Sequence, residues 1–122
     1  MSHIRETILV VDDEPAVRRL TALMLRSAGY EVYVAGSAAE AIELAERHGC
    51  GLNLLLTDMR MPFVDGHDLI GRIRQICPRV DVMVFTGFIG DDQRPRNYPI
   101  LGKPFTREQL LTAVREILDV QL

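Results

Sequence analysis

The stretch TILVVDD at residues 7–13 joins a strand-forming run to two carboxylates. Its first five residues form a continuous run of apolar and β-branched side chains, which is typical of a strand buried on both faces of a parallel sheet. Asp12 and Asp13 follow at once. A buried strand that ends in charged side chains indicates an α/β domain with a polar site at the ends of its strands.

Strand-like and helix-like segments alternate through the rest of the chain. The capping-box patterns SAAE at 37–40 and TREQ at 106–109 indicate two helix starts. Five buried strands alternating with helices imply parallel βα units with right-handed crossovers. We therefore expect a flavodoxin-like, doubly wound, five-stranded parallel sheet with strand order 2-1-3-4-5. The predicted strands are 7–11, 31–35, 52–58, 80–87 and 100–102, and the predicted helices are 14–28, 37–48, 66–76 and 106–118.

Two segments interrupt this alternation. The segment MRMPFVDG at 59–66 predicts a long loop. The segment FIGDDQRPRNYP at 88–99 contains two prolines, a glycine and a run of charged and amide side chains. It predicts a loop with at most one helical turn, so we expect the fourth helix of the fold to be reduced.

Length and composition set broad limits on the class of protein. The 122 residues are 48% hydrophobic and 25% charged, which is typical of a globular chain that buries its own core. We expect a single domain over residues 1–122, with its core at about 7–118. The net charge of −3 and the lack of a basic stripe argue against nucleic-acid binding. The chain has no apolar run of the ~20 residues that a membrane span needs and no signal-peptide pattern, so we expect a cytoplasmic domain without membrane contact.

Polar side chains stand at the ends of four predicted strands. Asp12 and Asp13 follow the first strand, Asp58 ends the third, Thr86 lies at the end of the fourth, and Lys103 follows the fifth. The carboxyl ends of parallel strands meet at one edge of the sheet, and these strands are neighbours in the expected order. We therefore expect the five side chains to converge on one pocket.

The chemistry of this set favours a phosphoryl site. Two unit charges about 5 Å apart cost about 3 kcal/mol at an effective dielectric constant near 20, so three carboxylates need raised pKa values or a bound cation. Oxygen ligands favour a hard ion, and we expect Mg²⁺. An aspartate can accept a phosphoryl group covalently, and a metal ion, an ammonium group and a hydroxyl group stabilise the transferring oxygens.

Each of these residues alone has an ordinary structural interpretation. Asp12 or Asp13 would suit the cap of the following helix, and Asp58 would suit a turn. Thr86 would be a common strand end, and Lys103 a solvated cation. Their joint placement at four neighbouring strand ends favours the functional interpretation. Lys103 is also the only lysine among fourteen basic residues, the rest being arginine, which indicates a position that needs a compact ammonium group.

Four motifs, in this order, resemble the receiver domain of two-component response regulators. They are ILVVDDEPAVR at 8–18, LLLTDMRMPFVDG at 54–66, VMVFTG at 82–87 and GKPF at 102–105. The resemblance covers about residues 7–118. The short segment after the fourth strand and the FTG sequence are similar in particular to receivers of hybrid sensor histidine kinases.

The resemblance implies a phosphoacceptor and a metal site. Asp58 matches the residue that takes a phosphoryl group from a histidine of a partner kinase or histidine phosphotransfer protein. Asp13 and Asp58 match direct Mg²⁺ ligands, Asp12 matches a residue that acts mostly through water, and the backbone carbonyl of Arg60 matches a third protein ligand.

The resemblance also implies a conformational switch. Thr86 matches the hydroxyl that moves toward the phosphoryl group, Lys103 matches the lysine that pairs with it, and Pro104 matches a cis proline that turns the lysine loop. Such a domain regulates a downstream protein or attached kinase domains. It is a signalling switch and not an enzyme, beyond catalysing its own phosphorylation and dephosphorylation.

The sequence departs from the family pattern near the switch. The position three residues before the lysine is usually Tyr or Phe, and here it is Ile100. Tyr98 lies two residues away, so it shares a face with Ile100 only if the strand is regular there. Arg60 and Phe88 stand two residues after Asp58 and Thr86, and we expect their side chains to flank the pocket and shield the acyl phosphate from water.

Two other classes of protein share part of this pattern. Aspartate-nucleophile phosphatases also combine aspartate, Mg²⁺ and lysine, but they carry an Asp-x-Asp pair after the first strand, whereas here Asp12 and Asp13 are adjacent. Flavodoxins share the fold, but the acidic stretch VDDEP at 11–15 would repel a flavin phosphate.

Overall fold

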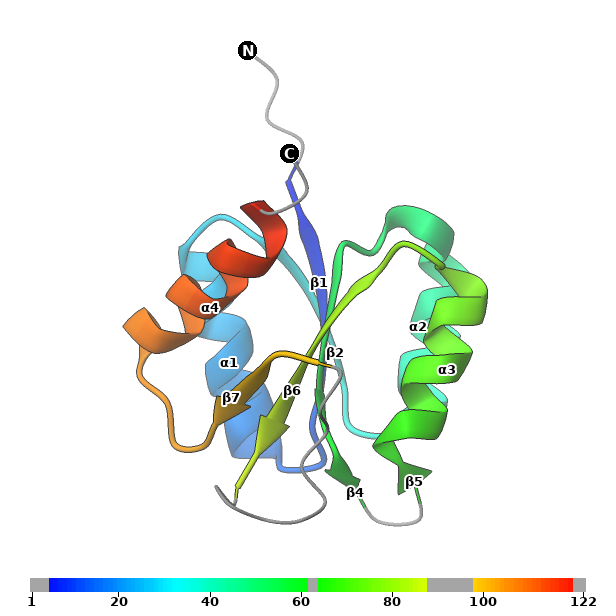
Figure 1. Ribbon diagram of the computed structural model, residues 1–122, viewed down its shortest axis with the longest axis horizontal. Helices are drawn as coiled ribbons and strands as arrows, with labels where there is room; N and C mark the ends of the chain where they lie inside the picture. Colours follow the sequence, from blue (N-terminus) through cyan, green and yellow to red (C-terminus); the bar gives the residue numbers. More distant parts are fainter. Residues whose placement is uncertain (1–4, 62–63, 88–97, 120–122) are drawn as a thin grey trace.

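The computed structural model describes residues 5–61, 64–87 and 98–119. Five parallel strands form its sheet, in the order β2-β1-β3-β6-β7 (Figure 1). In chain order this is the predicted 2-1-3-4-5 arrangement, which is confirmed. The strands are β1 (Thr7–Val11), β2 (Glu31–Ala35), β3 (Leu54–Asp58), β6 (Asp81–Thr86) and β7 (Ile100–Gly102).

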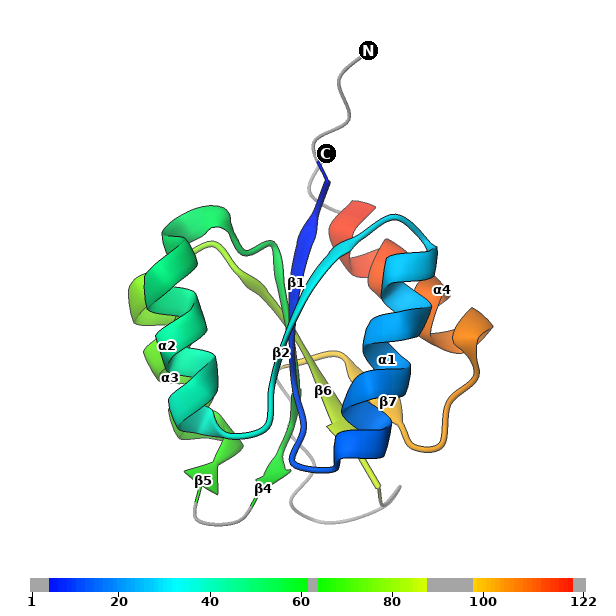
Figure 2. The ribbon, with the colours of Figure 1, turned by 180° about the vertical axis from the view of Figure 1, so that it is seen from behind.

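Helices cover both faces of the sheet. In the described part of the chain, α1 and α4 lie on one face, and α2 and α3 lie on the other (Figures 1 and 2). The helices are α1 (Pro15–Ser27), α2 (Ala38–His48), α3 (Gly66–Ile76) and α4 (Arg107–Asp119), and a short 3-10 helix, η1, covers Gly49–Gly51. These bounds agree with the predicted helices to within two residues.

The side-chain alternation of the strands divides the core into two layers. Leu9 and Val11 of β1 pack with α2 and α3, whereas Ile8 and Val10 pack with α1 and α4. All four side chains are fully buried. Each contributes roughly 1.5–3 kcal/mol by leaving water, which explains why a continuous apolar run is needed at the centre of this sheet.

Local sequence signals fix the helix ends. At the start of α2, the hydroxyl oxygen of Ser37 accepts a hydrogen bond from the backbone N–H of Glu40. Thr106 and Gln109 form both bonds of the predicted capping box before α4. Pro15 occupies the first turn of α1, where its missing N–H costs nothing.

One prediction of irregular structure was wrong. Within the predicted loop 59–66, β4 (Arg60–Met61) and β5 (Val64–Asp65) pair as a two-stranded antiparallel sheet. Strands of two residues are too short to show a period-2 pattern in the sequence. The pair lies beside the carboxyl ends of the strands, at the bottom of Figure 1.

The strand register brings the carboxyl ends of the central strands together. Val11 of β1 stands beside Thr57 of β3, Asp58 stands beside Phe85 of β6, and Thr86 stands beside Gly102 of β7.

The prediction of a reduced fourth helix falls on residues 88–97, outside the described residues. Among the helices described, none has the length and apolar character to cross a membrane.

Candidate functional site

Three carboxylates meet at the carboxyl edge of the sheet. Asp12, Asp13 and Asp58 place carboxylate oxygens within 4.8 Å of one another. Asp12 is fully buried, Asp58 is 8% exposed, and Asp13 is the most accessible of the three. The sequence predicted this convergence from strand ends alone, and the structure brings these residues together.

Lys103 is the cation of this cluster. Its Nζ donates hydrogen bonds to Asp12 Oδ2 at 2.6 Å and to Asp58 Oδ2 at 2.8 Å, and its side chain is 15% exposed. Burial disfavours the charged ammonium, but the hydrogen bonds and charges of Asp12 and Asp58 outweigh it, so the pKa of Lys103 is raised. Three carboxylates and one ammonium leave a formal net charge of −2 at this site.

The backbone around Lys103 aims its side chain. The N–H of Lys103 donates to the carbonyl of Thr86 at 2.7 Å. The Lys103–Pro104 peptide bond is cis, as the resemblance implies. The rings of Phe85 and Phe105 stack with centroids 5.3 Å apart, and Lys103 Nζ lies 5.8 Å from the Phe85 centroid. Strand, turn and aromatic packing together place the ammonium over the end of β3.

The backbone and side-chain polar groups of Asp12 all form hydrogen bonds. Its Oδ1 accepts a hydrogen bond from the backbone N–H of Glu14 at 3.0 Å, which is the local turn expected at a helix start. Its backbone N–H donates to the carbonyl of Ala35. Its carbonyl accepts from Arg18 Nη1 at 2.8 Å. The sequence pattern did not indicate a role for Arg18 at this site, although its place near the start of α1 brings it to the end of β1.

Three of the predicted switch residues, Thr86, Ile100 and Tyr98, lie on one face of the sheet. Thr86 ends β6 and is half-buried, and side chains alternate along a strand, so it shares a face with Val84. Ile100 pairs with Val84, and both Ile100 and Tyr98 pack against the core beneath α2 and α3. Tyr98 therefore lies on the same face as Ile100, although β7 begins only at Ile100.

Tyr98 also contacts α3. The guanidinium carbon of Arg74 lies 5.5 Å from the centroid of the Tyr98 ring.

The backbone of Arg60 belongs to β4, two residues after Asp58. The side chain of Arg60 and the whole of Phe88 lie outside what the structure describes, so their expected place at the mouth of the pocket stays a prediction.

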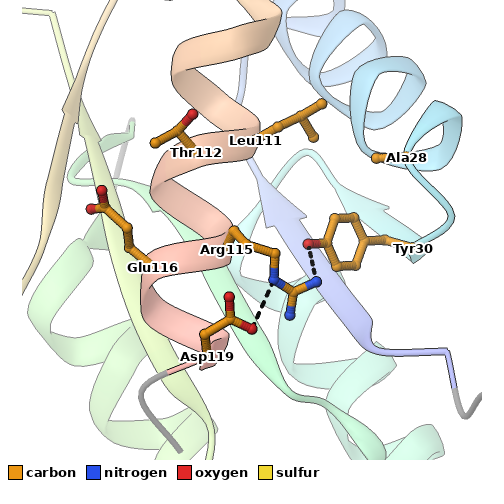
Figure 3. A pocket seen from close by; sticks show the side chains of 7 residues that line it. All are labelled: Ala28, Tyr30, Leu111, Thr112, Arg115, Glu116 and Asp119. Carbon is orange, nitrogen blue, oxygen red and sulfur yellow. Dashed lines mark hydrogen bonds and ion pairs between the residues drawn. The ribbon is translucent and has the colours of Figure 1, made fainter.

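A second polar cluster lies at the opposite, amino edge of the sheet (Figure 3). Here a groove of about 470 Å³ runs between the end of α1 and α4. Arg115 donates to the hydroxyl of Tyr30, to Asp119 Oδ1 and to Glu6 Oε1, each at 3.0 Å. These bonds use one N–H from each of the three nitrogens of the guanidinium, so Arg115 joins α4 to the residues just before β1 and β2.

Comparison with known proteins identifies the family. The model of the response regulator receiver domain matches residues 8–115. The chain is 36% identical over 121 residues to the sensor kinase CckA of Brucella abortus, covering 94% of this chain but only 13% of that protein. It is 34% identical to the receiver protein CpdR of the same organism, covering 91% of this chain and 95% of that protein.

The solved structures agree. The crystal structure of the receiver domain of the hybrid histidine kinase CckA matches with a TM-score of 0.81 and 34% identity, over 92% of this chain and 98% of that chain. Receiver domains are signalling switches that interact with histidine kinases or phosphotransfer proteins, and they use Mg²⁺ at an acidic pocket. The chain belongs to the response regulator receiver domain family.

Proposed function

We propose that Asp58 accepts a phosphoryl group and that the acidic pocket around it catalyses the transfer. The observation that carries this proposal is the position of Lys103, whose ammonium bridges Asp58 and the buried Asp12 beside Asp13. A surface ion pair would not bury a cation between two carboxylates while leaving a net charge of −2. This arrangement suits a site that receives a cation and an anionic group together.

In the proposed reaction, an oxygen of the Asp58 carboxylate attacks the phosphorus atom of a phosphohistidine. A new O–P bond forms as the P–N bond breaks, and the electron pair of that bond leaves with the imidazole, which takes up one proton. Lys103 then exchanges its hydrogen bond to the Asp58 carboxylate for one to a phosphoryl oxygen. Hydrolysis of the aspartyl phosphate by water restores the carboxylate and returns the domain to its starting state.

The residues of the pocket fit Mg²⁺. Carboxylate oxygens of three aspartates lie within 4.8 Å of one another, and hard oxygen donors with room for water are the ligand set that this ion prefers. We assign Asp13, Asp58 and the backbone carbonyl of Arg60 as direct ligands, with Asp12 acting mostly through water. When bound, the ion supplies positive charge that stabilises the transferring phosphoryl oxygens.

The conformational response is assigned to Thr86 and its neighbours. The hydroxyl of Thr86 moves toward the phosphoryl group, and the space that it leaves is on the face where Ile100 and Tyr98 pack. Because Ile100 replaces the usual aromatic residue, we assign the aromatic part of the switch to Tyr98, with Pro104 turning the lysine loop. Phe88 and Arg60 are assigned to shield the pocket from water.

The phosphoryl donor is a histidine kinase or a histidine phosphotransfer protein, and the output is a downstream protein or attached kinase domains. We propose that residues 1–122 act as a single receiver domain in the cytoplasm. Both CckA, a much longer protein, and CpdR, which this chain covers almost entirely, are relatives. A phosphatase with an aspartate nucleophile finds no support in these relatives.

The test is phosphorylation of the purified domain with a small acyl phosphate. With Mg²⁺ present, the intact mass of the wild-type protein should rise by one phosphoryl group, and EDTA should prevent this. Asp58→Asn should gain nothing. An equal gain in wild type and Asp58→Asn, or steady release of inorganic phosphate from aryl phosphates without a phosphorylated protein, would refute the proposal.

A further inference from the structure

We propose that Arg18 is a positioning residue of the metal site, which aims the carboxylate of Asp13 through the peptide bond that precedes it, and that Gly36 is glycine to make room for Arg18. This inference rests on the proposed function, because it concerns the affinity of the acidic pocket for Mg²⁺. It adds two residues, from α1 and from the segment after β2, to a site so far built from strand ends.

The peptide unit between Asp12 and Asp13 is held by Arg18. Arg18 Nη1 donates to the carbonyl oxygen of Asp12 at 2.8 Å. A peptide unit is planar, so fixing this carbonyl also fixes the N–H and Cα of Asp13. Asp12 is already held by its own N–H to Ala35 and by its side chain. For Asp13, the most accessible carboxylate of the cluster, the bond from Arg18 restrains the backbone just before it.

Gly36 provides the space for this guanidinium. A Cβ atom at residue 36 would stand 2.5 Å from Arg18 Nη1 and 3.2 Å from its Cζ. Real Cβ atoms do not make contacts as short as the first of these, so any side chain at 36 would displace the guanidinium. The φ angle of Gly36 is not in the left-handed region, so conformational freedom does not explain the glycine. Close approach of Arg18 does.

The direction of the change in Mg²⁺ affinity distinguishes a positioning role of Arg18 from a purely electrostatic one. Removing a cation near three carboxylates makes the pocket more negative, so charge alone predicts tighter Mg²⁺ binding when the Arg18 guanidinium is lost. Loss of positioning predicts weaker binding instead. Groups that orient metal ligands typically change metal affinity by about 10- to 100-fold. A weaker site in Arg18→Met therefore supports positioning against the charge effect.

The experiment measures Mg²⁺ affinity by calorimetric titration of the whole domain, with thermal unfolding measured alongside. Arg18→Met keeps the alkyl stem and its packing but removes the guanidinium, and we expect the dissociation constant to rise about tenfold. Arg19→Met is the matched control: it removes the neighbouring, exposed cation of α1, and we expect binding that is unchanged or slightly tighter.

Gly36→Ala tests the same contact from the other side. It keeps every charge and displaces only the flexible end of Arg18, so we expect weaker Mg²⁺ binding with little change in the melting temperature. The double variant Arg18→Met with Gly36→Ala should bind no more weakly than Arg18→Met alone, because both changes remove one interaction.

The outcomes separate this inference from the proposed function. If wild type binds Mg²⁺ and is phosphorylated on Asp58, while Arg18→Met binds Mg²⁺ as tightly as wild type or more tightly, the positioning role is wrong and the proposed function stands. Additive losses in the double variant would also overturn it. If Arg18→Met unfolds, Gly36→Ala decides: unchanged affinity contradicts the role. If the wild-type protein itself does not bind Mg²⁺, the proposed function is wrong, whatever the variants do.

Discussion

The two edges of the sheet each hold a cation bonded to two carboxylates, yet only one has the properties of a site. At the carboxyl edge, the side chain of Lys103 is 15% exposed, and the side chains of its partners Asp12 and Asp58 are 0% and 12% exposed. At the amino edge, the side chain of Arg115 is 46% exposed, and those of its partners Glu6 and Asp119 are 32% and 57% exposed. Similar distances thus occur in very different dielectric surroundings.

Exposure decides how much an ion pair contributes to the stability of the fold. Exposed pairs are screened by water and contribute little, typically below about 1 kcal/mol. Buried pairs cost free energy to desolvate, and a buried group with excess charge costs more. The amino-edge cluster joins α4 to the starts of the strands, and its exposed charges cost little free energy to desolvate. The carboxyl-edge cluster retains an unbalanced charge, which has a physical explanation if a cation and a phosphoryl group bind there.

The largest effect on the unmodified domain is expected from Lys103→Met. This change removes the cation while Asp12 stays buried beside two other carboxylates, and an unpaired buried charge typically costs about 3–5 kcal/mol. Urea unfolding without divalent ions should show this loss. A stability within about 1 kcal/mol of wild type would mean that the two edges do not differ as described.

A somewhat smaller effect is expected from Mg²⁺ itself. A ligand present at 100 times its dissociation constant stabilises the folded state by about 2.7 kcal/mol. Thermal unfolding of wild type should therefore shift upward with Mg²⁺, and the shift should be lost in Asp13→Asn. Arg115→Met should keep the shift in full. Equal shifts in wild type and Asp13→Asn would place the ion elsewhere.

Lys103→Arg separates charge from shape at the carboxyl edge. The guanidinium keeps the positive charge, so the unmodified fold should be nearly as stable as wild type. Its planar, wider head does not reproduce a compact ammonium between two carboxylates, so the phosphorylation-induced change at Thr86 and Tyr98 should be lost. Amide chemical shifts before and after phosphorylation measure this. A fully switching Lys103→Arg protein would show that the lysine is not required.

The smallest effect is expected from Arg115→Met at the amino edge. Its partners are partly solvated, so unfolding stability should fall by less than about 1 kcal/mol, and phosphorylation of Asp58 should not change. High salt should reduce the difference further. A loss as large as that of Lys103→Met would remove the distinction between the two edges.

Periodicity and strand ends predicted most of the fold and much of the site. The run at 8–11 could be assigned because a short apolar, β-branched run suits a strand buried on both faces, and all four residues are fully buried. Asp12, Asp13, Asp58 and Lys103 could be grouped because parallel strands end at one edge. The pairing of β4 with β5 could not be predicted, because two-residue strands leave no pattern.

Contacts between distant elements could not be predicted from the sequence either. In the sequence, Arg18 is one of several arginines in a helical segment, and Gly36 lies between a strand and the start of a helix. Only the folded structure shows that a Cβ atom at 36 would meet the Arg18 guanidinium. The packing of Tyr98 and Ile100 against the same core layer likewise depends on the path of the chain before β7, which the sequence pattern leaves open.

Asp58, and not its neighbours Asp12 and Asp13, is proposed to carry the phosphoryl group. Borohydride reduces an aspartyl phosphate to homoserine, so reduction of the phosphorylated domain followed by peptide mass spectrometry marks the acceptor. We expect homoserine at position 58 alone, in amounts that follow the phosphorylated fraction. Homoserine at position 12 or 13, or an unmodified residue 58 in a fully phosphorylated sample, would contradict it.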